Sequence, residues 1–127
     1  GDVADYHRKI TQAIYPQVVL RYETSDWLKF RVTERYDWIT CLFPFLFSDL
    51  HSRWGLNSRS FSPEKFYRKA FEHADRILFF HQGEEEAIES RRIIEEIQGA
   101  EILHEASYPD NSWMERKFPI HVIMASR

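Results

Sequence analysis

A helix signal followed closely by a buried-strand signal, in residues 62–80, constrains the fold of this chain more than any other feature. Ser62 and Pro63 are typical of a helix start, because Ser caps free N–H groups and Pro suits the first helical position. The apolar residues that follow recur at a helical spacing: Phe66, Tyr67, Ala70, Phe71 and Ala74. The run ILFF at 77–80 then predicts a buried strand. Such a helix buries its apolar face against a neighbouring layer, which favours an α/β fold.

The first third of the chain predicts one helix and two strands. Residues 4–15 have apolar positions at helical spacing, and Pro16 ends that helix. The β-branched run at 18–22 predicts a short strand. The nearly continuous apolar run at 38–47 is typical of a strand buried on both faces of a parallel sheet, with Pro44 stopping the pairing near its end. The polar stretch at 51–60 predicts a loop.

The last third of the chain predicts one more helix and two more strands. The strand at 77–80 ends at His81, and the acidic residues 84–86 suit the positive end of a helix dipole. Along this helix we expect Arg91 to pair with Glu95 and Arg92 with Glu96, and Gly99 to end it. Residues 102–108 and 120–125 predict strands, joined by a long polar loop that holds Trp113.

The resulting order is helix, strand, strand, helix, strand, helix, strand, strand. Buried strands that alternate with amphipathic helices indicate an α/β layer fold. The final two strands have no helix between them, which predicts a closing antiparallel pair at one edge of the sheet. The chain has no internal repeat and no Gly/Ser-rich linker, so residues 1–127 are predicted to form a single α/β domain.

Charge and cysteine content exclude several classes of protein. The net charge of −3 provides no basic field for a nucleic-acid backbone, which disfavours a nucleic-acid partner. The single cysteine, Cys41, excludes an internal disulfide and a cysteine-based zinc site, and it suits a reducing compartment. No apolar run approaches the ~20 residues that span a bilayer. We therefore expect a cytoplasmic protein with no membrane partner.

Polar and aromatic residues follow three of the predicted strands, at the ends where ligands collect in open α/β sheets. Asp26 and Trp27 follow the first strand, where a carboxylate and a ring suit a nucleobase; the alternative is that Asp26 caps a turn and Trp27 is core. Phe43, Pro44 and Phe45 follow the second strand and could wall a pocket or simply end a buried strand. His81 follows the third strand and is a candidate general base or a structural histidine.

Other catalytic patterns are weak or missing. The sequence contains no GxSxG elbow, no Walker loop and no GxGxxG. Cys41 has no nearby histidine or cation in sequence, which favours a buried inert thiol. The remaining histidines never fall at an HxxxH or HExxH spacing, so we expect no metal site. These histidines are His7, His51, His73, His104 and His121.

Several strings along the chain carry a family resemblance by their content and their order. In chain order they are GDVADY at 1–6, SDW at 25–27, RYDWIT at 35–40, FSPEKF at 61–66 with RILFF at 76–80, and FPIHVIMA at 118–125. Together they resemble the later part of a class I S-adenosylmethionine-dependent methyltransferase. GDVADY is similar to the end of the family's second strand, and SDW to the loop after its third strand. RYDWIT is similar to the entry to its fourth strand, and FSPEKF with RILFF to the helix and fifth strand that follow. FPIHVIMA is similar to its closing antiparallel strand.

This resemblance implies a fold, a cofactor and residue roles. It implies a three-layer Rossmann-like sheet, mostly parallel with a closing antiparallel strand, and S-adenosylmethionine as cofactor. Asp2 would hold the ribose hydroxyls, and Asp26 with Trp27 the adenine. The aromatic turn at 43–45, made of Phe43, Pro44 and Phe45, would line the path to the methyl acceptor.

The sequence also departs from the family pattern. The first strand and its Gly-rich loop would lie before Gly1, so we expect a fragment of a longer enzyme, a second chain that completes the sheet as a homo-oligomer, or a rearranged sheet. The turn at 42–45 lacks the leading Asn or Asp of the (N/D)PP(Y/F) motif, which disfavours base N-methylation. The alternative is a non-catalytic module that contacts a protein through aromatics around Trp54 and Trp113. A weaker alternative is another α/β enzyme, such as a nucleotide-binding or hydrolase domain.

Overall fold

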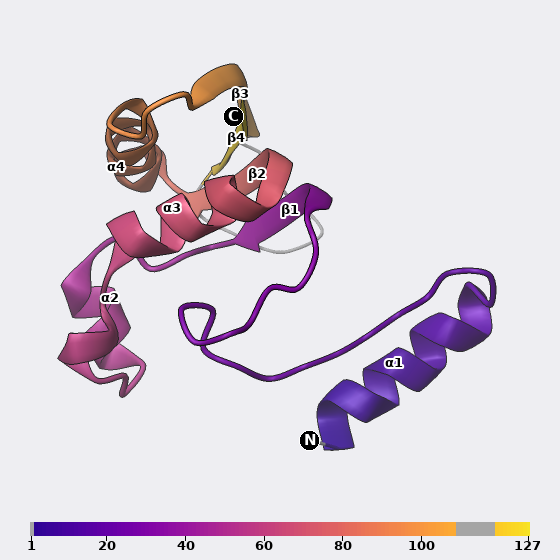
Figure 1. Cartoon of the computed structure of the whole chain (residues 1–127). Helices are drawn as coiled ribbons and strands as arrows, with labels where there is room; N and C mark the ends of the chain where they lie inside the picture. Colours follow the sequence, from indigo (N-terminus) through magenta and orange to yellow (C-terminus); the bar gives the residue numbers. More distant parts are fainter. Residues whose placement is uncertain (1, 109–118) are drawn as a thin grey trace. The chain divides into compact units, whose positions relative to one another are not determined.

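A computed structural model describes residues 2–108 and 119–127 of the chain (Figure 1). The chain forms two compact units, Gly1–Arg31 and Val32–Arg127. In the described ranges, none of the helices combines the length and the apolar character needed to cross a bilayer. The predicted loop that holds Trp113, and the start of the string at 118–125, lie outside the described residues.

The first unit is built on helix α1 (Asp2–Ile14), which confirms the helix predicted before Pro16. After the helix, the Gln12 side-chain amide donates to the carbonyls of Tyr15, Pro16 and Val18, at 3.1, 3.2 and 2.7 Å. The prediction that residues 1–6 end a strand is wrong, because residues 2–6 are helical.

The predicted strand at 18–22 is also wrong, because those residues have no regular secondary structure. Val19 is 84% exposed, and no strand among the described residues pairs with this run. A β-branched run forms a strand only where a neighbouring strand satisfies its backbone, so propensity alone misled the prediction.

The second unit contains a mixed α/β fold with an open four-stranded sheet (Figure 1). Its elements are β1 (Tyr36–Leu42), α2 (Ser48–Arg53), the 3-10 helix η1 (Ser58–Ser60), α3 (Pro63–His73), β2 (Ala74–Gln82), α4 (Glu84–Glu95), β3 (Glu101–Tyr108) and β4 (Ile120–Ser126). The strand order is β1-β2-β4-β3, with β1 and β2 parallel and β4 antiparallel to both neighbours. The predicted antiparallel pair at one edge is therefore confirmed as β3 with β4. Strand β3 is the edge strand, and β4 lies between β3 and β2.

Two further predictions need correction in this unit. The strand expected at 38–47 is shorter, and as β1 it lies at an edge of the sheet rather than buried on both faces. The stretch at 51–60 is not a plain loop, because it holds the end of α2 and all of η1. The predicted helix after Ser62 and the strand at 77–80 are confirmed as α3 and β2. Ser62 takes the N-cap position without a side-chain capping hydrogen bond, and α4 ends at Glu95, before the predicted end at Gly99.

Helices α3 and α4 cover the same face of the sheet and contact each other. Phe79 on β2 is fully buried beneath them, and its ring stacks on Tyr67 of α3 with centroids 4.3 Å apart. Ile77 on β2 and Ile123 on β4 complete this buried face. The described part of the second unit thus has one helix layer on its sheet, and the three-layer Rossmann-like form stays a prediction.

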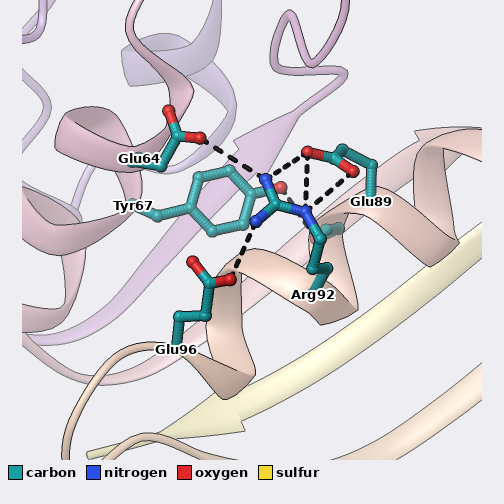
Figure 2. Close-up of polar contacts among 6 residues, drawn as sticks. Glu64, Tyr67, Glu89, Arg92 and Glu96 are labelled. Atoms are coloured by element: carbon teal, nitrogen blue, oxygen red, sulfur yellow. Dashed lines mark hydrogen bonds and ion pairs between the residues drawn. The ribbon is translucent and has the colours of Figure 1, made fainter.

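A polar network joins the two helices on the solvent side of this core (Figure 2). Arg92 of α4 pairs with Glu89 and Glu96 on its own helix and reaches Glu64 of α3 at 3.4 Å. The expected Arg92–Glu96 pair is confirmed, whereas Arg91 pairs with Glu105 of β3 at 2.9 Å instead of with Glu95. Because solvent screens the charges of Arg92 and most of its partners, these pairs add little to the free energy of unfolding.

Beneath this network, a buried hydrogen bond of 2.7 Å joins the Tyr67 hydroxyl to the Ser90 hydroxyl (Figure 2). We predict that Tyr67→Phe lowers the free energy of unfolding by about 1–3 kcal/mol, because it leaves the Ser90 hydroxyl buried without this partner. Urea denaturation measures the change. The exposed Tyr6 is the matched control, and Tyr6→Phe is expected to change nothing measurable. Equal losses in the two variants would contradict the assignment.

Candidate functional site

The carboxyl ends of the parallel strands β1 and β2 lie side by side where these strands end, and we call this end of the sheet the carboxyl edge. Their register pairs Leu42 with Phe80, and the N–H of Phe43 donates to the Phe80 carbonyl at 2.9 Å. Strand β4 begins at the same edge, with Ile120 opposite Gln82. Because ligands of open α/β sheets bind outside the carboxyl ends of the strands, this edge is the candidate site.

Phe43 turns the chain away from β1 through an unusual backbone conformation. Its φ is +52°, and it is the one non-glycine residue of the described chain with a positive φ. A bulky residue in this left-handed region costs on the order of 1 kcal/mol or more, and such strain is concentrated at functional sites. Phe43, Pro44 and Phe45 are all half-buried here, so the structure places the predicted aromatic turn at the candidate site.

An aromatic cluster continues from this turn into the segment that the sequence predicted as a loop. The buried His51 ring meets Phe45 edge-on at 5.5 Å and Phe61 at 5.4 Å. Trp54 lies 6.4 Å from Phe45 and is 76% exposed. Sequence reasoning missed this cluster, because a lone histidine in a polar stretch carries no periodic signal.

His51 and Ser60 lie close together but do not form an activated nucleophile. The Ser60 hydroxyl donates to the Asn57 carbonyl at 2.7 Å, and Ser60 Oγ lies 3.2 Å from His51 Nε2. Since the hydroxyl proton is already used, His51 Nε2 is the donor to Ser60 Oγ. This pair therefore holds η1 against α2, and nothing in it removes a proton from Ser60.

His81 lies within β2 and is fully buried, rather than in a loop after the strand. Its ring is nearly parallel to Phe79, and neither ring nitrogen has a hydrogen-bond partner among the described residues. Burial, with a smaller contribution from the neighbouring His121, lowers the pKa of His81 to about 4. The imidazole is therefore neutral at pH 7 and a weak base.

A small cavity lies on the helix side of β3 and β4, with a volume of about 230 Å³. Arg91 and Glu105 line it, and their side chains are joined by hydrogen bonds of 2.9 and 3.2 Å. Ser107 and His121 add polar atoms to its wall. Small-molecule sites usually have volumes of ~300 Å³ or more, so this cavity suits at most a small polar molecule.

Two titratable groups of the second unit, the Glu86 carboxyl and the Cys41 thiol, have raised pKa values. Burial raises the pKa of Glu86, at the start of α4, and a hydrogen bond with the Gln82 backbone partly offsets this effect. Cys41 is buried, as predicted, and burial raises the pKa of its thiol to about 12. Among residues 2–108 and 119–127, no group of three or more metal-ligating side chains is placed to hold a metal ion.

The remaining predicted site residues, Asp2, Asp26 and Trp27, belong to the first unit. Asp2 begins α1. Asp26 caps a turn: its carboxylate accepts from the Leu28 N–H at 3.0 Å, and its carbonyl accepts from the N–H groups of Lys29 and Phe30. The Trp27 ring stacks on that of Phe30 with centroids 6.2 Å apart. The turn-capping alternative for Asp26 is thus confirmed.

Comparison with known proteins adds no relative: no protein-family model, curated protein or solved structure matches the chain.

The buried His81 predicts a pH-dependent stability. Its pKa is about 4 in the folded chain, against 6.5 for an unperturbed histidine, so acid protonates the unfolded chain first. The free energy of unfolding is unaffected by His81 above pH ~6.5 and falls by about 3 kcal/mol between pH ~6.5 and ~4. His81→Leu removes this component, whereas His104→Leu, at an exposed position, keeps it. Parallel pH profiles for wild type and His81→Leu would contradict the prediction.

Proposed function

We propose that this chain serves S-adenosylmethionine-dependent methyl transfer. The observation that carries the proposal is the topology of the second unit. Strands β1 and β2 are parallel, α3 lies between them in sequence, and β4 is antiparallel. The methyltransferase resemblance assigns these elements to the fourth strand, the following helix and fifth strand, and the closing antiparallel strand. A three-layer Rossmann-like domain belongs to this proposal.

The described residues fit only part of such a cofactor. The proposal assigns the adenine to Asp26, whose carboxylate also caps its turn, and to Trp27, and it assigns the ribose hydroxyls to Asp2. The sequence holds no glycine-rich loop for the methionine end, and the 230 Å³ cavity is too small for the whole molecule.

On the acceptor side, the proposal assigns the half-buried Phe43, Pro44 and Phe45 to the path of the substrate. Methyl transfer requires an in-line approach of the acceptor atom, so its catalysis is mainly positioning. His81 is the candidate base, and its low pKa makes it a weak one. The assignment of the acceptor side therefore rests mainly on the half-buried turn at 43–45 and less on the His81 imidazole.

A second candidate function is a non-catalytic module that acts through protein contact. The open face of the sheet favours it, because Trp38 and Leu42 are 44% and 67% exposed on the side away from α3 and α4. The exposed Trp54 adds a large ring to the same unit. The single cysteine supports a reducing, cytoplasmic location for either function.

The two candidates differ in a calorimetric titration of the chain with S-adenosylhomocysteine. Methyl transfer predicts saturable binding, and Asp26→Ser weakens it roughly tenfold, because serine can cap the turn but lacks the carboxylate. Glu23→Ser, an exposed acid of the same unit, is the control and keeps the wild-type affinity. Binding that is unchanged by Asp26→Ser overturns the adenine assignment, and no heat at millimolar ligand shows that this chain alone does not hold the cofactor.

A further inference from the structure

The two edges of the four-stranded sheet differ in how they are protected. Edge strand β3 has an irregular register between Ile102 and His104, and it carries the carboxylates of Glu101 and Glu105. Bulges and charges of this kind prevent pairing with other chains. Edge strand β1 has the sequence YDWITCL, a regular register with β2, and Asp37 as its one charged residue. Strand β3 is therefore protected against pairing with another chain, whereas β1 is not.

In the described part of the chain, the backbone of β1 has unpaired hydrogen-bonding groups on its outer side. The N–H of Phe43 points toward β2, since it donates to the Phe80 carbonyl. Because successive residues of a strand point their N–H groups to opposite sides, those of Trp38 and Thr40 point away from β2. Among residues 2–108 and 119–127, β1 pairs with β2 alone.

The helix layer of the second unit leaves β1 accessible. Helix α3 packs on β2, and α4 packs on β2, β4 and β3. On the open face, the Arg76 guanidinium lies over the Trp38 ring, 5.5 Å from its centroid, yet Trp38 stays 44% exposed. An added strand at this edge would cover apolar surface of Trp38 and Leu42 and satisfy the outer backbone groups together.

We infer that the partner of this edge is β1 of a second copy of the chain, paired antiparallel about a two-fold axis at Ile39. This register uses the whole strand, with Tyr36 opposite Leu42 and Trp38 opposite Thr40. It also brings each outward-facing residue opposite another one, which antiparallel pairing requires. Asp37 faces Cys41 of the other copy, so the carboxylates of the two copies do not oppose each other.

A two-fold β1–β1 contact is a closed arrangement, whereas β1 against β3 of another copy would repeat without closing. The carboxylates and the irregular register of β3 disfavour that open arrangement. The inferred dimer has one continuous sheet with both helix layers on the same face. It depends on the β1 edge alone and stands whether or not the chain binds S-adenosylmethionine.

Sedimentation equilibrium of the whole chain tests the inference. The wild type is expected to be a monomer–dimer equilibrium. Thr40→Pro removes an outward N–H without touching the β2 ladder, and proline is tolerated at strand edges. It should raise the dimer dissociation constant roughly tenfold to a hundredfold. Thr40→Val keeps the N–H and the β-branched shape, and should associate like the wild type.

Amide hydrogen exchange of the wild type gives a second readout that needs no variant. In the dimer, the outward amides of Trp38 and Thr40 exchange slowly at high protein concentration and faster on dilution. The inward amides of Ile39 and Cys41 are protected at both concentrations. A wild type that stays monomeric at every concentration overturns the inference. So does a dimer in which the Trp38 and Thr40 amides exchange fast, or an open series of larger species.

Discussion

The stack of Phe79 on Tyr67 is the interaction on which the second unit depends. Phe79 projects from β2, which pairs with both β1 and β4, so its position determines where a helix can pack. Tyr67 brings α3 down onto that ring, and its hydroxyl binds Ser90 of α4. One buried pair of rings and one buried hydrogen bond therefore join both helices to the sheet. The exposed network around Arg92 adds alignment on the outside and little free energy.

The same packing explains the character of the candidate site. His81 follows Phe79 by two residues and so points to the same buried face, where it lacks polar partners among the described residues. The site at the carboxyl edge consequently has an apolar aromatic turn, a neutral histidine and a buried thiol, Cys41. Such an edge suits positioning of a flat or apolar group better than proton transfer. The open face is the complementary result of a helix layer on one side, whereas β1 is an edge strand because it pairs with β2 alone among the described residues.

Most elements of the second unit were predictable from sequence, because their signals are local. The Ser62–Pro63 start, the apolar stripe of α3 and the ILFF run each specify an element without reference to a partner. The run at 18–22 failed because a strand needs a neighbouring strand. Of the candidate site, the turn at Phe43 was predictable from its place after a strand. Its positive φ and the His51 cluster were not, because both depend on contacts between segments.

The sequence by itself determined the α/β class, the order of the strands and long helices in the second unit, and the absence of an internal disulfide. Periodicity, capping residues and the count of cysteines are properties of the chain that need no partner. Only the tertiary structure decided that β4 lies between β2 and β3, that β1 is an edge, and that His81 is buried rather than exposed. Strand order and burial arise from which segments meet across the sheet, and side-chain acidity follows from burial.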